Sequence, residues 1–583
     1  MGQPGAAYAK GAKYQWLLPT IDVGVVHALS ARYNFVIPLM QTLVRRGFDT
    51  PEKIDAFLFT DAQRDIAPSL LLQDAAKAVE RICLAIERKE KILIVGDYDV
   101  DGITATSLLL YCLKEIGASV NYFLPHRVND GYGLSSSIIK RAAANHYHLV
   151  ITVDNGITAI EPVEYATQAG IDVIITDHHR PHAVLPAAYA VVNPARSDCA
   201  YPYKELAGVG VTFKLVSLLY ERLNWPLPEK AYELLLLGTI ADVVPLTGEN
   251  RYWVRYCLGR VNESASQAFQ VLKNNGGLAQ KPAIGSIDIA FSLAPQLNAL
   301  GRLQDPRQGV QFLIDSRAET VDKVGRLLFE LNEARKNIER SIMAEIMWAI
   351  DQKQIDVANE SVIVAASTQW PVGVIGLVAS RLVAEFGKPV VLFHVAENGL
   401  AKGSGRSIAA FDLFAALQEL AFMFEHFGGH AQAAGICLKA ELLPRFKDAL
   451  ADLVRKRLTP SDLQQKIVLD ATLPLNEINE TFVRHLHFLE PFGHANEAPI
   501  FHISDVALLE QPSLLKGLHV KCRVTAGGAV KSIIFFNRPE LFELLRLCAD
   551  RPFAVAVQVT ENYWQGNKTI ELRGVDIAVP GDI

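Results

Sequence analysis

The sequence predicts an α/β protein with two α/β lobes, which a long helix joins and a small C-terminal β-barrel follows. Between residues 70 and 195, short apolar runs alternate with segments of helical length. Residues 318–352 carry apolar side chains at helical spacing, and strand-like runs with Gly turns dominate from residue 465 onward. Alternating strands and helices indicate βαβ units and a parallel sheet, whereas many short strands are typical of a barrel.

The first lobe is predicted from its alternating pattern. Strands are expected at 91–96, 119–124, 148–153, 171–176 and 188–192, and helices at 74–88, 103–117, 135–145 and 160–169. Because parallel strands need right-handed crossovers, each helix should return over a face of the sheet. Residues 205–275 are expected to be mainly helical, and the apolar run 234–241 delivers one acid, Asp242.

The segment 318–352 contains no Pro and a single Gly, and it predicts a continuous helix. Such a helix would be about 50 Å long at about 1.5 Å per residue. It could be a core helix of one domain. Because it falls between two α/β patterns, we interpret it as the connection between two lobes.

The second lobe and the tail complete the predicted organisation. In the lobe, strands are expected at 361–366, 389–395 and 433–438, helices at 374–386, 411–426 and 442–457, and glycines in the connections. In the tail, strands are expected at 466–473, 500–508, 517–525, 529–536, 553–560 and 568–578. The expected domains are an N-terminal helical segment 1–60, a first α/β domain 61–316, a connecting helix 317–358, a second α/β domain 359–460 and a C-terminal barrel 461–583.

Length and composition limit the class of protein. A chain of 583 residues exceeds one core and should hold three or four domains. The seven cysteines form no Cys-x-x-Cys pair, which excludes a zinc finger and favours a reducing cytoplasm. We expect no signal peptide and no membrane span, since no stretch approaches 18 uninterrupted apolar residues. The net charge of −6 gives no support by itself for nucleic acid binding.

Acids and histidines follow several of the apolar runs at the point where each run ends. They are Asp97, Asp99 and Asp101 after 92–95, Asp154 after 149–153, Asp177, His178 and His179 after 173–176, and Asp242 after 234–241. An isolated Asp at such a place often caps the next helix. Burying this many carboxylates without cations would be costly, and parallel strands end at one edge of a sheet. The oxygen-rich donor set therefore predicts a Mn²⁺ or Mg²⁺ site rather than a structural zinc site.

These motifs together resemble the DHH phosphoesterase superfamily. The segments 97–102, 153–156, 177–179 and 238–242 look like its four motifs. Further segments resemble its RecJ branch, namely 297–303, 373–381, 403–407, 428–435 and 490–494. The resemblance implies a catalytic lobe, a smaller DHH-associated lobe and a C-terminal OB-like barrel.

The resemblance also implies roles for individual residues. The implied ligands of two divalent ions, Mn²⁺ or Mg²⁺, are Asp97, Asp99, Asp101, Asp154, His178 and Asp242. Asp154 would bridge the ions, and His179 would contact the phosphate or the leaving group. Arg302, Ser404 and Arg406 would hold the 5′-phosphate, with His430 facing the substrate cleft between the lobes. The residue pattern alone favours a hairpin with an exposed Arg at 403–406 over a phosphate-binding site.

Two further groups of residues could contact nucleic acid. Tyr132 lies between glycines and could stack on a base, and Arg127 could hold a phosphate. Tyr132 could equally be a packing residue. The tail places Lys516, His519, Lys521, Arg523 and Lys531 near Phe535 and Phe536, which fits a single-strand-binding barrel or a solvated strand face over a core.

The resemblance implies a single-stranded-DNA-specific 5′→3′ exonuclease that releases mononucleotides in DNA repair and recombination. Its partners would be single-stranded DNA, a single-strand-binding protein and a repair helicase, and we expect a cytoplasmic monomer. The alternatives are a phosphodiesterase for short oligonucleotides or cyclic dinucleotides, and a non-catalytic replication scaffold.

The chain departs from the family pattern at two places. Pro371 stands where relatives usually carry His, which affects a secondary contact. Val95 and Gly96 stand where distant relatives place a metal-binding His, and we expect Asp97 to take that role.

Overall fold

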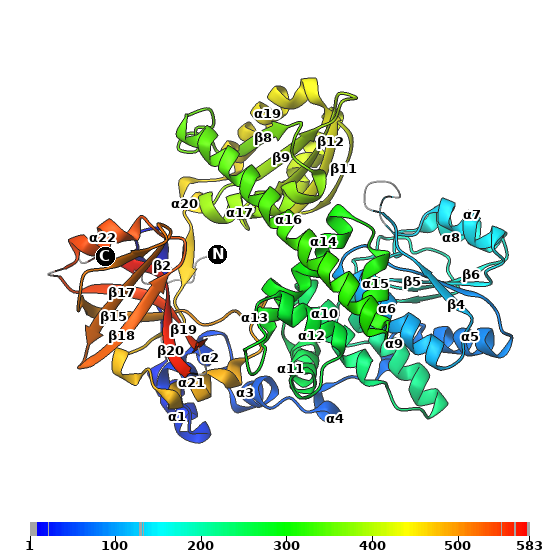
Figure 1. Ribbon diagram of the computed structural model, residues 1–583, viewed down its shortest axis with the longest axis horizontal. Helices are drawn as coiled ribbons and strands as arrows, with labels where there is room; N and C mark the ends of the chain where they lie inside the picture. The colour runs from blue at the N-terminus through cyan, green and yellow to red at the C-terminus, as the bar shows by residue number, and fades with distance from the viewer. Residues whose placement is uncertain are drawn as a thin grey trace. The chain divides into compact units, whose positions relative to one another are not determined.

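The computed structural model describes residues 8–20, 22–126, 131, 133–549, 551–564 and 567–579, which divide into two compact units (Figure 1). Among these residues, unit 1 holds 8–17 and 331–468, and unit 2 holds 18–330 and 469–579. The boundary between the units falls inside the long helix α16 (Ala318–Asp351), which the sequence predicts almost to the residue.

Unit 2 contains the predicted parallel sheet. Its strand order is β4 (Val120–Phe123), β3 (Ile92–Val95), β5 (Leu149–Val153), β6 (Asp172–Thr176) and β7 (Ala190–Val192). All neighbouring pairs are parallel. Every residue of β3 and β5 is buried, because helices cover both faces, and this explains their unbroken apolar sequence.

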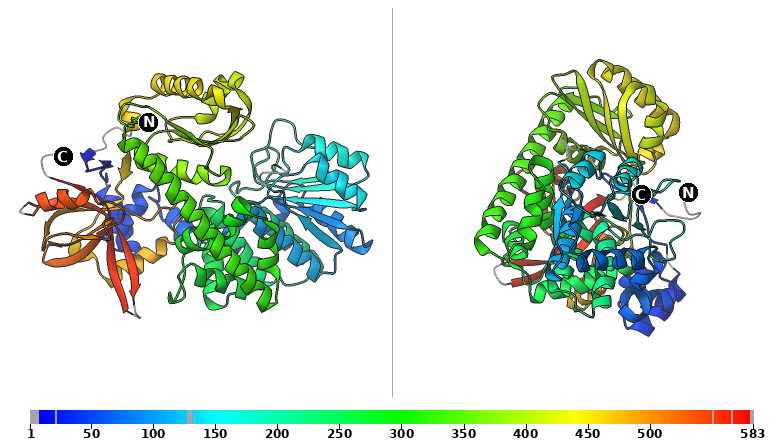
Figure 2. Two further views of the ribbon diagram at one scale, coloured as in Figure 1. Left: turned by 45° about the horizontal axis from the view of Figure 1, so that its top comes forward. Right: turned by 90° about the vertical axis from the view of Figure 1, so that its right-hand side faces the viewer.

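Helices lie on both faces of this sheet (Figures 1 and 2). On one face, α7 (Ser136–Ala144) and α8 (Ile160–Gln168) share a core with Val150, Val173 and Ile175. The other face is covered by α5 (Ala75–Glu87), α6 (Val100–Glu115) and α9 (Gly208–Leu223).

A helical region follows the sheet in unit 2. Its helices are α10 (Glu229–Ala241), α11 (Gly248–Glu263), α12 (Gln267–Asn275), α13 (Ser286–Asp288), a π-helical turn (Ile289–Leu293), α14 (Ala294–Leu303) and α15 (Arg307–Ile314). Helix α10 packs against α6 and α9. Its C-cap residue, Asp242, therefore comes to the edge of the sheet that carries the other acids.

Unit 1 contains a mixed sheet of order β11 (Phe424–His430), β12 (Ala433–Lys439), β10 (Leu400–Arg406), β9 (Val390–Val395) and β8 (Ile363–Ser367). Only β8 and β9 pair in parallel. Helix α17 (Val372–Phe386) packs on β9 and β10, whereas α18 (Leu413–Glu419) and α19 (Leu443–Arg457) share a core with Phe393 and Leu438.

Two sequence predictions for unit 1 are wrong. The predicted helix 411–426 is the short α18, a 3₁₀ turn (Ala421–Met423) and the start of β11. The glycines expected in connections lie within β10, β11, β12 and α17. A Cβ on Gly405 would lie 2.7 Å from Leu413 Cδ2, so this glycine leaves room for a core side chain instead of forming a turn.

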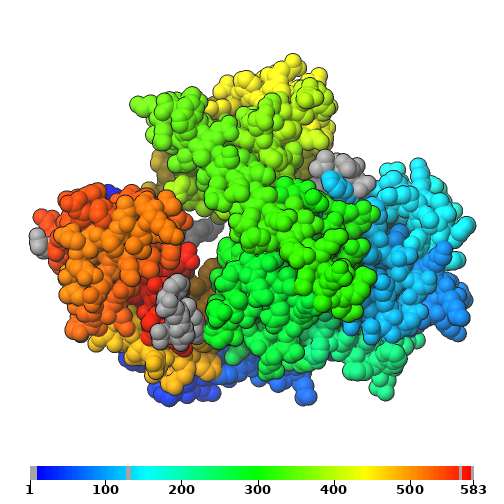
Figure 3. All heavy atoms as spheres, in the orientation of Figure 1, coloured from blue at the N-terminus to red at the C-terminus, as the bar shows by residue number. Residues whose placement is uncertain are grey.

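The C-terminal part of unit 2 is the predicted barrel. Its sheet order is β14 (Ala471–Thr472), β15 (Phe501–Leu508), β19 (Phe553–Trp564), β20 (Asn567–Ala578), β18 (Ala529–Phe535), β17 (His519–Ala526) and β16 (Ser513–Leu515). An additional pairing of β15 with β17 closes it, and β18 pairs with β20 in parallel. Closure leaves only the short strands β14 and β16 at the ends of the sheet, and the strands form one packed body (Figure 3, orange).

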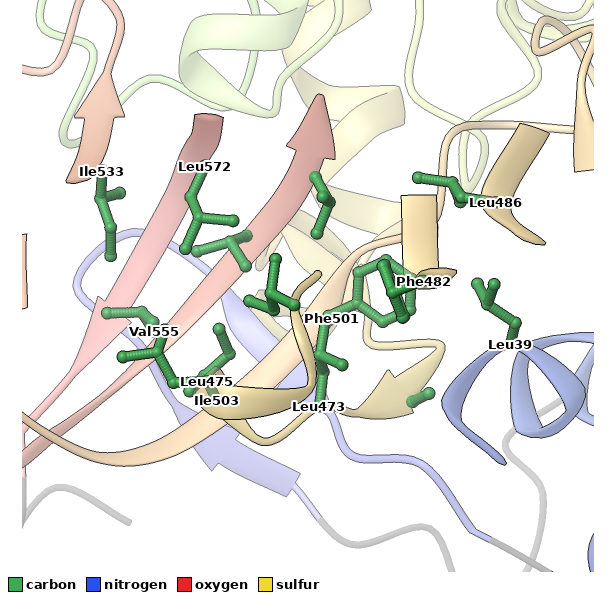
Figure 4. Close-up of a cluster of buried hydrophobic side chains, with 14 of the residues drawn as sticks. Leu39, Leu473, Leu475, Phe482, Leu486, Phe501, Ile503, Ile533, Val555 and Leu572 are labelled. Carbon is green, nitrogen blue, oxygen red and sulfur yellow. The ribbon is translucent and has the colours of Figure 1, made fainter. Parts of the chain in front are cut away.

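The N-terminal helices pack into the core of this barrel. Residues of α1 (Val23–Tyr33), α2 (Ile37–Arg45) and α3 (Pro51–Leu58) share one buried cluster with it. Figure 4 shows Leu39 of α2 beside Phe482 and Phe501. By length and composition, α1 and α2 pass a membrane-span test only as a pair bent by 120°, and no single helix among the described residues passes it.

The remaining elements are short. In unit 1 they are β1 (Tyr8–Lys10), β2 (Gln15–Leu17) and β13 (Lys466–Val468), which form a small sheet, α20 (Pro460–Leu463) and a 3₁₀ turn (Ala440–Leu442). In unit 2 they are α4 (Ala62–Asp65), α21 (Glu480–Leu486), α22 (Leu541–Leu547) and 3₁₀ turns at Ser69–Leu71, Leu475–Glu477 and His487–Leu489.

Candidate active site

The acid triplet lies where β3 passes into α6. Asp99 is the N-cap of α6, and its side chain accepts a hydrogen bond from Gly102 N–H at 3.1 Å. Asp101 is 1% exposed and accepts hydrogen bonds from the Gly208 and Val209 N–H groups at 2.6 and 2.8 Å. These donors belong to the N-terminal end of α9, whose dipole favours a negative charge. Asp97 is also buried.

Asp154 occupies the equivalent place after β5. Its φ of 61° is left-handed, a conformation that Asp adopts more readily than most residues. The amide of Asn155 donates to the carbonyl oxygens of Val95 and Val153 at 3.0 and 2.9 Å, which ties the ends of β3 and β5 together. The local backbone therefore holds Asp154 toward the acids that follow β3.

His178 lies among three of these carboxylates. Its Nε2 atom is 3.1 Å from Asp154 Oδ1, 3.6 Å from Asp242 Oδ2 and 3.9 Å from Asp101 Oδ2. Within the described parts of the chain, His178 Nε2 and Asp242 Oδ2 are buried without a hydrogen-bond partner. Buried polar atoms without partners are rare, and together they make a place suited to a cation.

Asp177 holds the neighbouring His179. One Asp177 oxygen is 2.7 Å from His179 Nδ1 and accepts the backbone N–H groups of His178 and His179, while the other accepts Ile157 N–H at 2.9 Å. The imidazole of His179 is half exposed. Asp177 thus fixes the ring orientation and leaves the far side of the ring accessible.

The structure brings together all the sequence-predicted metal ligands at one edge of the sheet. Three sets of residues could each hold a metal ion, because within each set the ligand atoms lie within 4.8 Å of one another. The sets are Asp154, His178 and His179; Asp101, His178 and Asp242; and Asp97, Asp99 and Asp154. Asp154 and His178 each belong to two sets. Carboxylate oxygens with imidazole nitrogens fit Mn²⁺ or Mg²⁺.

The buried acids have perturbed pKa values. Burial, reinforced by the charge of Asp99, raises the pKa of Asp101 to about 7. Burial and the neighbouring carboxylates also raise the pKa values of Asp154 and Asp242 well above the usual range. Each carboxylate makes the next one harder to ionise, so without cations the site resists full ionisation at neutral pH.

The two histidines shift in opposite directions. Burial lowers the pKa of His178 to about 4, so this ring is neutral and suited to metal ligation. Burial also acts to lower the pKa of His179, but the hydrogen bond and charge of Asp177 outweigh it and raise that pKa to about 9. In return, His179 holds the pKa of Asp177 below its usual value despite burial.

Stability of the metal-free protein should depend on pH through these acids. Because the folded pKa exceeds the unfolded value near 3.8, the folded state holds protons that the unfolded state releases. Stability from this source is present below pH 4 and lost as pH rises toward 7. In chelator, Asp154→Asn should therefore gain stability relative to wild type between pH 4.5 and 8, as thermal unfolding measures. A difference that is independent of pH would contradict this.

Two glycines pack directly against the acids of the site, and the sequence analysis did not identify the more important one, Gly208. A Cβ on Gly208 would lie 2.6 Å from both Cβ and Oδ1 of Asp154, and a Cβ on Gly238 would lie 3.0 Å from Asp101 Oδ1. Gly238 belongs to the motif 238–242, whereas Gly208 lies outside every motif identified in the sequence. Its only signal in the sequence is the Gly-Val-Gly at the start of α9.

Helix α14 supports the acid triplet from another side. Asn298 Oδ1 accepts the Val100 N–H at 3.3 Å, and Gly301 packs against the backbone of Tyr98. Arg302 is the next residue and is partly exposed in the last turn of α14. The structure thus places Arg302 beside the loop that carries the metal-site acids.

Ser404 and Arg406 lie on β10 of unit 1. Arg406 Nη1 donates to Ser404 Oγ at 3.0 Å and to Gly405 O at 2.7 Å. A Cβ on Gly376 of α17 would lie 2.8 Å from Ser404 Oγ, so α17 lies directly against this pair. His430 ends β11 and is exposed. The segment 403–406 is therefore an interior strand and not a hairpin.

The other predicted positions have different outcomes. Arg127 and Tyr132 lie outside the described residues. Pro371 is the N-cap residue of α17, and the neighbouring Trp370 donates to Glu345 Oε2 at 2.7 Å. On the barrel, Lys521 and Arg523 point outward from β17, whereas Phe535 is fully buried in the core. Phe536 is 42% exposed, and its ring lies 5.3 Å from that of His519.

Comparison with known proteins agrees with this geometry. Residues 91–239 match the DHH family N-terminal domain, 359–456 the DHHA1 domain and 469–576 the RecJ OB domain. The chain is 35% identical over 556 residues to the single-stranded-DNA-specific exonuclease RecJ of Dickeya dadantii, covering 92% of this chain and 94% of that protein.

Solved structures give the same result. The structure of RecJ in complex with Mn²⁺ from Thermus thermophilus is 27% identical, with a TM-score of 0.82 over 97% of this chain and 79% of the other. A structure of RecJ in complex with Mg²⁺ from the same organism is 26% identical, with a TM-score of 0.74 over 97% and 78%. The fold class and the resemblance predicted from sequence are confirmed, and this chain belongs to the RecJ family of single-stranded-DNA-specific exonucleases.

Proposed function

We propose that this protein is a metal-dependent exonuclease that degrades single-stranded DNA from the 5′ end to mononucleotides in DNA repair and recombination. The observation that carries the proposal is the cluster of buried carboxylates and imidazoles around His178 and Asp154. Family membership supplies the substrate and direction, and the intact ligand set argues for an active enzyme.

We assign the metal ligands as Asp97, Asp99, Asp101, Asp154, His178 and Asp242, holding two divalent ions, Mn²⁺ or Mg²⁺. Asp154 belongs to two of the ligand sets, one with His178 and His179 and one with Asp97 and Asp99, which supports a bridging role. Bound divalent cations would neutralise the phosphate and lower the pKa of the attacking water. Neutral His178 offers Nε2 as a ligand atom, and the α9 N–H groups keep Asp101 oriented.

His179 is proposed as the catalytic residue that contacts the scissile phosphate or the leaving oxygen. Its Nδ1 is held by Asp177 at 2.7 Å, so its Nε2 lies on the side of the ring away from that carboxylate. A protonated, half-exposed imidazole donates a charge-assisted hydrogen bond to an anionic oxygen. The proposed mechanism requires no Ser or Cys nucleophile.

We propose that Arg302, Ser404 and Arg406 bind the 5′-phosphate and that His430 is a further substrate contact. Arg127 is proposed to hold a phosphate, and Tyr132 to stack on a base. The Ser404–Arg406 pair is preorganised, because the hydroxyl and the guanidinium already contact each other. A planar guanidinium suits two oxygens of a terminal phosphate.

The proposed domains are the segment 1–60, the catalytic domain 61–316, the connecting helix 317–358, the DHHA1 domain 359–460 and the barrel 461–583. We propose that Lys521 and Arg523 on the barrel face bind the strand, with a single-strand-binding protein and a repair helicase as partners. We expect the protein to be a cytoplasmic monomer.

A substrate panel tests the proposed function directly. The purified protein is incubated with Mn²⁺, Mg²⁺ or chelator and with 5′-labelled single strands, duplexes and dinucleotides. We expect metal-dependent release of the labelled mononucleotide from single strands and slow attack on blunt duplex. Preferred cleavage of dinucleotides would favour a phosphodiesterase, and inert single strands would contradict the proposal.

Loss of 5′-phosphate recognition is expected for Arg406→Ala. Because a charged hydrogen bond contributes about 1.5–3 kcal/mol, kcat/KM for 5′-phosphorylated strand should fall about 10- to 150-fold. The effect on 5′-hydroxyl strand should be much smaller. Arg445→Ala, which changes an arginine elsewhere in unit 1, serves as control. Equal losses on both substrates would make Arg406 a structural or general backbone contact.

A further inference from the structure

Unit 2 contains a cavity of about 970 Å³ that the proposed metal site does not account for. Its lining includes Ala241 and Val243, on either side of the proposed ligand Asp242, and Gln558 and Arg573 of the barrel strands. The cavity therefore lies between the residues that flank Asp242 and the barrel, inside a single compact unit.

An exposed aromatic side chain lines this cavity. Phe291 is 76% exposed, an unusual state for a phenylalanine in a helical region, and Ile287 beside it is 45% exposed. Burial therefore gives no reason for an aromatic residue at position 291. An exposed ring in a cavity wall provides a flat apolar face for a ligand.

Phe291 lies in a locally irregular part of the helix. It lies in the π-helical turn Ile289–Leu293, where Ala294 N–H donates to Ile289 O. Pro295 follows four residues after Phe291, lacks an N–H group, and its ring crowds the carbonyl at that spacing. The widened turn results from this clash, and such turns occur frequently at functional sites.

A second apolar residue in the lining of the cavity, Val243, has a strained backbone conformation. Val243 has a φ of 61°, which a β-branched residue rarely adopts, and it is 64% exposed. Strain of this kind persists where the surrounding structure enforces it, commonly at functional sites. Val243 therefore continues the apolar wall of the cavity up to Asp242.

The polar part of the lining carries charges of both signs, and several of them are paired. Glu561 pairs with His487 at 3.4 Å and with Lys568, and Lys281 pairs with Asp288 at 2.5 Å. The lining therefore has no strong preference for a charged ligand. A flat, uncharged group with hydrogen-bonding edges, such as a nucleobase, fits an apolar wall with carboxylate and amide groups opposite.

We propose that this cavity receives bases of the DNA strand on the 3′ side of the bond being cleaved, with Phe291 as the stacking surface. The inference rests on the proposed exonuclease function. If cleavage proceeds from the 5′ end, the uncleaved strand must leave the metal site on its 3′ side, and the cavity leads from there toward the barrel.

The test combines Phe291→Ala with abasic substrates. The probe is a 5′-phosphorylated 20-nucleotide oligothymidylate in which one base at a time, from the second to the sixth, is replaced by an abasic spacer. With wild type and Mn²⁺, one or two spacer positions should lower kcat/KM for release of the first nucleotide by about 5- to 150-fold, the range for loss of one stacked base. Phe291→Ala should lose a similar factor on the intact strand and become insensitive to those spacers.

Two variants separate stacking from folding. Phe291→Trp keeps an aromatic face and should retain activity on the intact strand. Phe422→Ala makes the same change at a 70% exposed phenylalanine in unit 1 and should behave as wild type. Phe291→Ala should also retain the wild-type melting temperature, since the exposed ring contributes little burial.

The outcomes distinguish this inference from the function on which it rests. A wild-type protein that fails to cleave the intact strand contradicts the exonuclease proposal. A cleaving wild type, with Phe291→Ala within twofold of it or still sensitive to the same spacers, overturns the role of the cavity alone.

Discussion

Asp154→Ala and His178→Ala are each expected to lower single-strand nuclease activity by at least about 1,000-fold, equivalent to about 4 kcal/mol of transition-state stabilisation. Each residue belongs to two of the three ligand sets, so each change removes a ligand from two adjacent sites. The substitutions leave the sheet intact, because both side chains lie beyond the ends of their strands.

Activity should be measured with saturating Mn²⁺, and isothermal titration should show reduced Mn²⁺ binding. His182→Ala, at an exposed histidine four residues from His178, provides the matched control and should behave as wild type. Either variant retaining activity within tenfold of wild type, in a folded protein, would contradict the two-metal assignment.

The position of this site was predictable because parallel strands impose it. Strands β3, β5 and β6 are buried and largely apolar runs. An acid follows β5 and β6 at once, and follows β3 after Gly96. Since neighbouring parallel strands end at one edge, Asp97, Asp154 and Asp177 had to approach one another. Asp242 comes from a helix, so its place depends on the packing of α10 against α6, which the motif suggested and periodicity alone would not have given.

The parts that could not be predicted depend on contacts between distant segments. Leu39, Met40 and Leu43 of α2 have few diagnostic features in sequence, yet they are fully buried in the barrel cluster with Phe482 and Phe501. No local pattern shows that a helix near residue 40 packs on residues near 500. Removing the barrel would therefore expose these side chains and would test the stability of the N-terminal segment more than strand binding.

Glycine misled the sequence interpretation of the second lobe for a physical reason. In most chains a Gly-rich segment indicates a turn, because Gly adopts left-handed conformations without cost. In β10 the glycines serve close packing, since Gly405 faces Leu413 and Ser404 pairs with Gly435 across the sheet. The choice between a turn and a crowded strand depends on neighbours that are distant in sequence.

The same effect makes Gly208 a sensitive position of the active site. Gly208→Ala is expected to lower activity at least about 100-fold on every single-stranded substrate, because displacing a catalytic group by about 1 Å has a cost of that size. The new Cβ would lie 2.6 Å from Asp154 Oδ1, and Gly208 N–H also donates to Asp101 at 2.6 Å. Any shift that relieves the overlap therefore moves Asp154 or weakens the hold on Asp101.

Gly210, two residues after Gly208, provides a matched control. Gly210→Ala places its Cβ 3.4 Å from Leu206, an ordinary contact, in the same turn of α9. This variant should retain near wild-type activity, since alanine favours a helix more than glycine does. Comparing the two by kcat/KM and by Mn²⁺ affinity separates the effect on the metal site from a general effect on α9. Equal losses in both variants would show that the glycines serve the helix and not Asp154, whereas loss confined to Gly208→Ala, with weaker Mn²⁺ binding, is the expected result.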